Sequence, residues 1–153
     1  MAVTIRVDDL TASPTRALVR AHLADMCALS PVESVHALDV AALRSASVGF
    51  WSAWAGDRIA GIGALQRLET GHGEVKSLRV DEAFRGTGVG RALLRHIILT
   101  AEVEGMPRLW LETGSAESFL PARRLYASEG FIDCRPFGAY RADPLSVFMT
   151  RAV

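Results

Sequence analysis

Three glycines alternate with other residues in RGTGVG, the segment at positions 85–90. A run with the alternation of a strand precedes this segment, and a run with the period of a helix follows it. Glycine lacks a Cβ atom, so it allows positive φ values and a close approach of a ligand to the backbone. The first turn of a helix presents unpaired N–H groups and a partial positive charge, which suits a phosphate group. The segment therefore predicts a strand–loop–helix unit with an anion-binding loop, to which Arg85 and Arg91 add positive charge.

Two common phosphate-binding motifs do not fit this loop. The dinucleotide-binding pattern GxGxxG, begun at Gly86, needs a glycine at position 91, where the chain has Arg91. The P-loop pattern GxxxxGK[ST] fails at the same residue, and no Lys-Ser or Lys-Thr pair follows. For the loop considered alone, a glycine-rich turn without a ligand stays as the alternative.

The order of the apolar runs predicts a mixed α/β fold in one domain over residues 1–153. Strands are expected at 4–7, 48–55, 58–68, 74–80, 108–112, 131–135 and 146–151. Helices are expected at 14–28, 88–104 and 119–129, and the capping-box spacing of Ser30 to Glu33 predicts a further helical stretch toward Leu43. The early strands indicate an antiparallel meander, with a hairpin turn at Gly56-Asp57. The strand–helix–strand order that follows favours a right-handed parallel crossover.

The charge balance limits the classes of partner. The 153 residues include 17 Lys and Arg and 17 Asp and Glu, so the formal net charge is zero. Nucleic acids and anionic membranes demand a clear basic excess, so neither is expected as a partner. The first residues lack the pattern of a secretory signal, and no apolar run approaches the roughly 20 residues of a membrane span. Cys27 and Cys134 have no CxxC spacing and are expected to be small buried residues in a reducing compartment. These features predict a cytoplasmic protein.

Two further patterns carry a family resemblance. The segment R-x-x-G-x-G after a strand that ends in Leu78-Arg79-Val80 resembles motif A of the GCN5-related N-acetyltransferase (GNAT) superfamily. Downstream, the segment from Ala122 to Phe131 resembles the second signature of that superfamily, A-x-x-L-Y-x-x-x-G-F. The phrases HALD, FWSAW, LETGS and DPLSVFM are similar to a bacterial YsnE-like subgroup, some of whose members are labelled indole-3-acetate acetyltransferases. The resemblance covers the chain from about residue 48 to its end.

The resemblance implies a GNAT fold, with a mixed central sheet of about seven strands that splays between strands 4 and 5 and about four flanking helices. It also implies acetyl-CoA as co-substrate, with the pantetheine arm along the fourth strand and the pyrophosphate at the glycine loop. One position departs from the family pattern, because Phe119 stands where the second signature often has Asn. The cofactor-binding residues so implied are Leu78, Arg79, Val80, Arg85, Gly86, Thr87, Gly88, Val89, Gly90, Arg91 and Phe119.

Acyl transfer to an amine needs a base, because an alkyl ammonium has a pKa near 10. Strand alternation predicts Glu74, Lys76, Leu78 and Val80 on one side of their strand, and some family members have their base at the position of Glu74. The alternatives are a solvated carboxylate paired with Lys76, His72 as the base, or a water molecule. Tyr126 occupies the position of the family's general acid, and its alternative is a tyrosine that packs on the sheet.

The acceptor is expected to be an amine of a small molecule or peptide. Trp51 and Trp54 are predicted on opposite faces of their strand, so that one is buried and the other lines the acceptor pocket. The scattered histidines predict no metal site. A non-catalytic acyl-CoA-binding or regulatory module of the same fold is the alternative function, and a homodimer is one alternative for the assembly. The expected acceptor-binding residues are His36, Trp51, Tyr140 and Arg141.

Overall fold

The computed structural model describes residues 2–29, 31 and 35–153. The predicted capping box at Ser30 to Glu33 lies outside these residues except for Pro31. The helix that follows is short and spans only Val40–Leu43, where the Asp39 side chain caps it by accepting a hydrogen bond from the N–H of Ala42.

The elements follow the predicted order closely, with boundaries that differ by one or two residues. The strands are β1 (Thr4–Val7), β2 (Val48–Ala55), β3 (Arg58–Arg67), β4 (Gly73–Val80), β5 (Arg108–Gly114), β6 (Ile132–Cys134) and β7 (Ser146–Ala152). The helices are α1 (Ser13–Leu29), α2 (Val40–Leu43), α3 (Val89–Val103) and α4 (Leu120–Ser128), with short 3₁₀ turns at Glu82–Phe84 and Glu117–Phe119. The predicted mixed α/β fold is confirmed. None of the described helices combines the length and the apolar character needed to cross a membrane.

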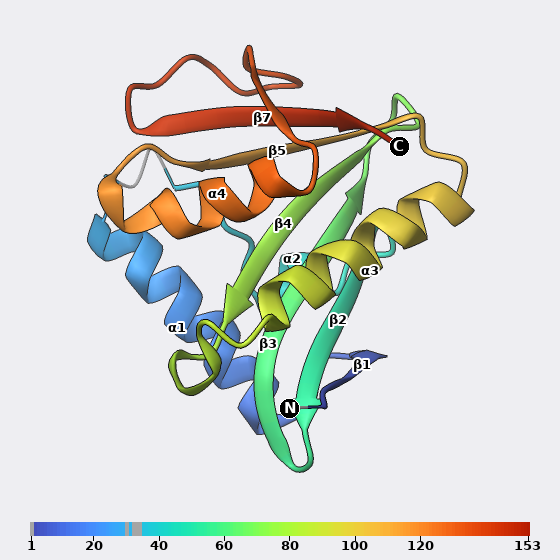
Figure 1. The fold of residues 1–153 in the computed structure, drawn as a ribbon, viewed down its shortest axis with the longest axis vertical. Coiled ribbons are helices and arrows are strands. Elements are labelled where there is room, and N and C mark those ends of the chain that lie inside the picture. Colours follow the sequence, from blue (N-terminus) through green and yellow to red (C-terminus); the bar gives the residue numbers. More distant parts are fainter. Residues whose placement is uncertain (1, 30, 32–34) are drawn as a thin grey trace.

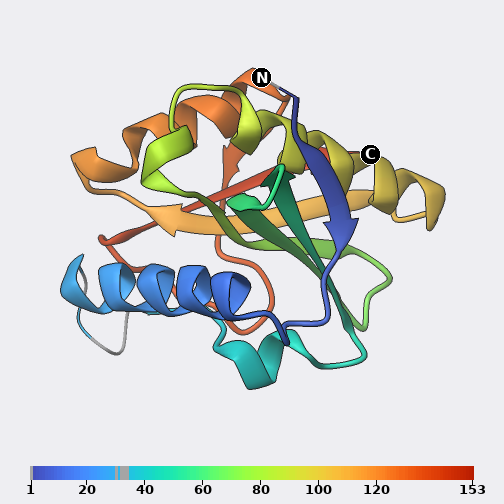
Figure 2. The same ribbon diagram turned by 90° about the horizontal axis from the view of Figure 1, so that it is seen from below.

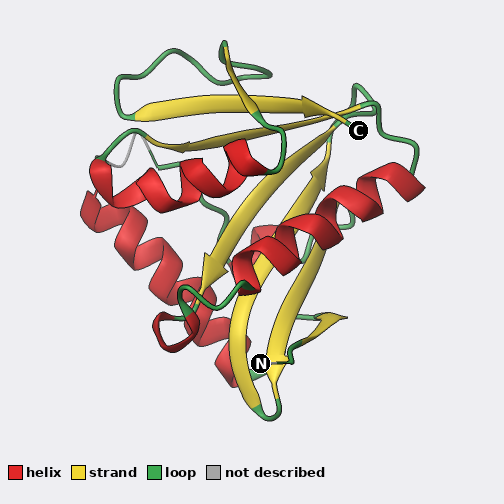
Figure 3. Cartoon of the chain, in the orientation of Figure 1, coloured by secondary structure: helices red, strands yellow, loops and turns green. Residues whose placement is uncertain are grey.

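One seven-stranded sheet separates two layers of helices. Its strand order is β1-β2-β3-β4-β5-β7-β6, with β4 and β5 parallel and the other neighbouring pairs antiparallel. Helices α3 and α4 cover one face, and α1 and α2 lie on the other (Figure 2). Figure 3 shows the same layers with the strands crossing between the two sets of helices.

The sheet splays between β4 and β5, as predicted. Only two residue pairs join these strands, Gly73 with Leu109 and Glu74 with Trp110. Beyond these pairs the strands diverge into a wedge, with α1 and α4 at its open end (Figure 1). The edge of β4 that faces β5 therefore has no strand partner over most of its length.

A bulge in β4 corrects the predicted alternation. Ser77 has a positive φ of 54°, and the register with β3 shifts between Ile62 and Ala64. Because the bulge adds one residue, the side chains beyond it change face. Leu78 and Val80 pack with α3 in the core, whereas Glu74 and Lys76 lie on the opposite face. The prediction that these four residues share one face is therefore wrong.

Two hydrophobic clusters fill the space between the sheet and the helices. The larger contains the apolar face of α3, which packs on the glycines of β3: a Cβ atom at Gly61 would lie 2.9 Å from Leu93 Cδ1. The smaller joins α1 and α2 to β2 and β3. The cysteines belong to neither cluster. Cys27 is exposed on α1 and Cys134 is half-buried on β6, which corrects the expectation that both are buried.

We expect Leu93→Ala to lower the free energy of unfolding by about 2–5 kcal/mol, since it leaves a cavity at a fully buried site. Leu99→Ala, on the same helix but 57% exposed, is the matched control and should change that free energy by less than about 0.5 kcal/mol. Urea unfolding of both variants measures the difference. Equal decreases in the free energy of unfolding for the two variants would show that α3 does not pack on the sheet through the face that contains Leu93.

Candidate functional site

The wedge between β4 and β5 forms a long groove of about 970 Å³. Its walls come from β4, β5, the C-terminal half of α1, the segment before α3, and α4. Nine of the eleven predicted cofactor-binding residues line it, namely Leu78, Arg79, Val80, Arg85, Gly86, Gly88, Gly90, Arg91 and Phe119. The structure thus brings together side chains that the sequence places more than forty residues apart.

The glycine loop presents free N–H groups at one end of the groove. Gly86 and Gly88 have φ values of 75° and 91°, a left-handed conformation that favours glycine. Gly88 is the N-cap of α3, and no side chain caps this helix. Within the described part of the chain, the N–H groups of residues 86–91 have no main-chain acceptor. These groups, at the positive end of a helix of 15 residues, suit a phosphate.

Two loop residues have structural roles instead. The hydroxyl of Thr87 donates a hydrogen bond to the carbonyl of Phe84, which closes the turn, and Val89 is buried in the core. Neither side chain lines the groove. Gly90 allows close packing, because a Cβ atom there would lie 3.2 Å from Val80 Cγ2.

The two arginines that flank the loop differ in their contacts. Arg91 forms an ion pair with Glu129 at 2.7 Å and donates to the hydroxyl of Ser128, so it also ties α3 to the end of α4. Arg85 is exposed and has no recorded side-chain contact with an acidic residue in the described part of the chain. A bound anion can therefore pair with Arg85 without breaking an existing ion pair.

Phe119 packs directly over Gly114 at the end of β5. A Cβ atom at Gly114 would overlap the ring of Phe119, so a larger residue there would displace the ring. Phe119 thus contributes an apolar wall of the groove where the family pattern has a polar amide.

Tyr126 of α4 lies in the wall of the groove and is 7% exposed. Its ring packs edge-on against Phe131, with centroids 5.9 Å apart. Burial raises the pKa of its hydroxyl well above the ordinary value of 10, and the negative charge of Glu112 adds to the increase. Tyr126 is therefore a protonated phenol at neutral pH.

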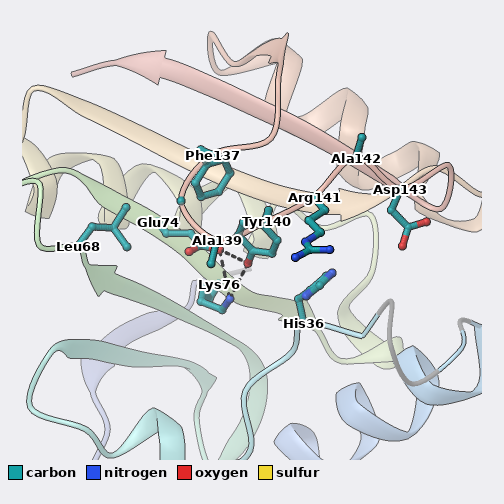
Figure 4. A pocket seen from close by; sticks show the side chains of 11 residues that line it. His36, Leu68, Glu74, Lys76, Phe137, Ala139, Tyr140, Arg141, Ala142 and Asp143 are labelled. Atoms are coloured by element: carbon teal, nitrogen blue, oxygen red, sulfur yellow. Dashed lines mark hydrogen bonds and ion pairs between the residues drawn. The ribbon is translucent and has the colours of Figure 1, made fainter.

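A second, smaller cavity of about 610 Å³, here called the pocket, adjoins the groove. Most of its wall is the segment at residues 137–143, between β6 and β7 (Figure 4). Gly138 has a φ of 58°, and the N–H of Tyr140 donates to the carbonyl of Phe137, so a tight turn carries Tyr140 back toward the sheet. His36, Leu68, Glu74 and Lys76 complete the wall.

Four residues line both cavities and so mark their boundary: His36, Glu74, Lys76 and Tyr140. Glu74 Oε2 accepts a hydrogen bond of 2.6 Å from the Tyr140 hydroxyl and one of 3.2 Å from Lys76 Nζ. Lys76 Nζ also donates to the Tyr140 oxygen at 3.0 Å, which closes a triangle of contacts (Figure 4). The ring of His36 packs edge-on against Tyr140, 4.8 Å between centroids.

The recorded hydrogen bonds of this triangle use only one carboxylate oxygen of Glu74. Both recorded bonds reach Oε2, and in the described residues no side chain is recorded as a partner of Oε1. Glu74 is only 6% exposed. A buried carboxylate with a spare acceptor site strongly favours a cation or an N–H donor at that point.

Glu112, on β5, is a second acidic residue of the groove that the sequence does not single out. Burial raises the pKa of its carboxyl group, an effect opposed by the charges of His36 and Lys76. The rise means that Glu112 holds a proton more readily than an exposed glutamate. The negative charge that Glu112 contributes near Tyr126 therefore decreases as the pH falls.

The α1 wall also contains polar residues that the sequence analysis does not anticipate. Arg79 Nη2 donates to Asp25 Oδ2 at 2.6 Å, while its buried Nε has no hydrogen-bond partner among the described residues. Burial, followed by the charge of Arg79, lowers the pKa of His22 to about 4, so its imidazole is neutral at pH 7. Helical periodicity indicates the apolar face of α1 but gives no sign that these polar residues meet β4.

Two predicted site residues lie elsewhere. Trp51 is 6% exposed in the core beside His96 of α3, and it lines neither cavity; Trp54 is buried as well. The prediction that one of these tryptophans lines the acceptor pocket is therefore wrong, since both faces of β2 are covered. His72 lines neither cavity, and its Nδ1 accepts a hydrogen bond of 2.9 Å from the Trp110 indole. Among the described residues, no group of His, Cys, Asp or Glu is arranged to hold a metal ion.

A model of the acetyltransferase (GNAT) family matches residues 16–131. The chain is 52% identical to the uncharacterized N-acetyltransferase YsnE of Bacillus subtilis over 96% of its own length and 97% of that protein. It is 47% identical to the uncharacterized N-acetyltransferase YedL of Escherichia coli, over 96% and 92% of the two chains. It is 40% identical to a protein of Azospirillum brasilense named IAA acetyltransferase, over 80% of each chain.

Two solved structures have the same fold. A Klebsiella pneumoniae protein described as an acyl-CoA N-acyltransferase superposes with a TM-score of 0.80 at 27% identity, over 98% of this chain and 97% of that one. A Bacillus subtilis acetyltransferase in complex with CoA superposes with a TM-score of 0.69 at 19% identity, over 99% of each chain. The likeness extends over the whole sheet and both layers of helices.

Tyr126 and Tyr140 are the two tyrosines of the chain, and burial, with a nearby glutamate in each case, raises the pKa of both above the ordinary range. We expect denatured protein to titrate near pH 10 and native protein to show no tyrosinate absorbance at that pH. Above that pH the unfolded chain releases protons that the folded chain keeps, so the free energy of unfolding should fall as the pH rises. Titration of the native protein near pH 10 would contradict the burial of both hydroxyls.

Proposed function

The chain belongs to the acetyltransferase (GNAT) family, and we propose that it transfers the acetyl group of acetyl-CoA to an amine by direct attack in a ternary complex. One observation carries this proposal. The groove runs from the glycine loop past Tyr126 to Glu74, and at Glu74 it meets a second cavity. A donor and an acceptor that occupy the two cavities would meet between a protonated phenol and a carboxylate.

The groove suits a CoA thioester along its whole length. The free N–H groups of residues 86–91 and the side chain of Arg85 would hold the pyrophosphate. The pantetheine arm would follow the unpartnered edge of β4 near Leu78 to Val80, where its amides can replace the missing strand. The Bacillus subtilis neighbour crystallised with CoA supports a CoA site in a chain of this fold.

Glu74 is proposed as the base. Its Oε1 would accept a proton from the acceptor ammonium and pass it to solvent, and the amine nitrogen would then attack the thioester carbonyl carbon. The second proton of that nitrogen would leave through the same carboxylate as the carbon–sulfur bond breaks. Tyr140 and Lys76 fix the carboxylate through Oε2, so that its other oxygen keeps one orientation. His72, the other candidate base in the sequence, is engaged by Trp110 outside both cavities.

Tyr126 is proposed as the acid. When the carbon–sulfur bond breaks, the sulfur would take the phenolic proton, and the tyrosinate would recover a proton from solvent once the products leave. The raised pKa of Tyr126 makes the phenol a weaker acid. The same burial raises the pKa of a thiol bound beside it, so the difference between the two groups stays moderate.

Direct attack agrees with the positions of the two cysteines. Cys27 and Cys134 line neither cavity, so neither thiol is placed to take the acetyl group first. Positioning of both substrates in adjoining cavities would supply much of the rate enhancement, because it removes the entropic cost of bringing them together.

We expect Tyr126→Phe to lower kcat by about 10²- to 10⁴-fold, the usual contribution of a general acid. The dissociation constant of CoA should stay unchanged, because the ring that lines the groove is kept. Thiol release with an acetylated amine measures kcat, and calorimetry measures CoA binding. An unchanged kcat would remove Tyr126 from the mechanism. Tight CoA binding without thiol release for any amine would favour a non-catalytic acyl-CoA-binding module.

For Glu74→Gln we expect loss of activity at neutral pH and partial recovery at higher pH, where more of the acceptor is already free amine. The amide keeps the size of the carboxylate and can still accept the Tyr140 hydrogen bond. Glu69→Gln removes an exposed carboxylate outside both cavities and is the matched control. A constant ratio of mutant to wild-type rates from pH 6.5 to 9.5 would rule out Glu74 as the base.

A further inference from the structure

The pocket has a size and a chemistry that define its ligand more narrowly than an amine. Its volume of about 610 Å³ lies within the usual range for a small-molecule site and is enclosed by one short segment and the end of the sheet. Its wall includes an acidic group where it joins the groove, aromatic rings, and a cation. This inference rests on the proposed function, since it takes the pocket as the acceptor site.

The cation is Arg141. In the described part of the chain its guanidinium has no recorded hydrogen bond or ion pair, and its side chain lies beside His36 at the pocket (Figure 4). The other cation of the pocket, Lys76, is already paired with Glu74. Asp143 lines the same cavity, and its Oδ1 accepts a hydrogen bond from the N–H of Leu145. A guanidinium fork without an acidic partner matches the geometry of a carboxylate.

The rings of the aromatic wall pack against one another. Phe137 and Tyr140 pack edge-on with centroids 4.9 Å apart, and Phe137 is supported from behind by Trp110 at 5.3 Å and by Phe148 at 6.0 Å. Together with Leu68, these rings give the pocket an apolar surface. Such a surface favours an apolar or aromatic group in the ligand.

We propose that the acceptor is a free amino acid with an apolar or aromatic side chain. Its carboxylate would bind the guanidinium of Arg141, its side chain would pack on Phe137 and Tyr140, and its amine would meet Oε1 of Glu74. The acetyl carbon leaves the sulfur of CoA and joins the amine nitrogen, and the sulfur takes the proton of Tyr126. The ammonium gives up two protons through Glu74, one before the attack and one after it; both pass to solvent, from which Tyr126 recovers its proton. The products are an N-acetyl amino acid and CoA. The carboxylate and the ammonium of an amino acid are attached to the same carbon, and Arg141 and Glu74 offer each of them a group of opposite charge in one pocket.

The test compares amino acids with their amides, for example phenylalanine and phenylalaninamide, leucine and leucinamide. The amide lacks the carboxylate charge and has the more easily deprotonated amine, so a preference for the acid cannot come from amine basicity. For the wild type we expect kcat/KM to favour at least one acid over its amide by about 10- to 100-fold, the usual range for a charge-assisted hydrogen bond. Most of the difference should lie in KM.

Arg141→Gln should remove this preference by lowering kcat/KM for the acid much more than for the amide. Arg141→Lys should restore part of it. Arg135→Gln removes a positive charge from the same connection between β6 and β7, but Arg135 lines neither cavity. This control variant should behave as wild type. Acetylation of amides as efficiently as acids, or an Arg141→Gln variant that keeps the preference, would overturn the substrate class while the acetyltransferase function stands.

A binding measurement separates this inference from the catalytic one. Calorimetry with N-acetylphenylalanine and N-acetylleucine on the CoA-loaded protein should show binding that Arg141→Gln abolishes and Arg135→Gln retains. If this binding is found but no amine releases thiol, the carboxylate site is supported and the proposed transfer is wrong. If neither product binds and neither acid is acetylated, the substrate class is overturned.

Discussion

The divergence of β4 from β5 is the constraint on which the rest of the site depends. Two residue pairs hold the strands together, and beyond them the backbone groups on the facing edges lack a strand partner. A closed sheet would satisfy these groups internally and leave no room between the strands. The open sheet instead needs helices on both sides to keep the wedge from closing, and α1 and α4 lie at its open end (Figure 1). The groove therefore arises from the way the strands pair, and the side chains that line it determine only its detailed shape.

The same divergence explains the position of Glu74. It is the last residue of β4 that pairs with β5, so its side chain lies where the wedge begins. The segment between β6 and β7 crosses the sheet at that point and brings Tyr140 within 2.6 Å of the carboxylate. A buried carboxylate needs such partners, since transfer from water costs several kcal/mol unless hydrogen bonds and charges compensate. The triangle of Glu74, Lys76 and Tyr140 supplies that compensation and still leaves one oxygen for a ligand.

Much of the fold could be predicted from the sequence because most of its signals are local. Alternation marks the strands, a 3.6-residue period marks α1, α3 and α4, and the glycine loop marks the end of β4. The predictions are wrong where a tertiary contact overrides a local sequence pattern. The bulge at Ser77 shifts the faces of β4, and no composition signal accompanies it. Trp51 is buried because α3 covers that face of β2, which periodicity within β2 cannot reveal.

The sequence predicts three residues of the pocket, His36, Tyr140 and Arg141, but not its shape, for a physical reason. Its wall at residues 137–143 has neither strand nor helix periodicity, and its shape comes from a turn at Gly138 and from rings that are far apart in sequence. The donor groove, by contrast, consists of backbone groups and glycines at the ends of regular elements. Changes in the segment between β6 and β7 can therefore alter which acceptor fits while the sheet and the glycine loop stay intact. Only residues at the shared boundary, Glu74 above all, contact both cavities, so a substitution there would affect donor and acceptor together.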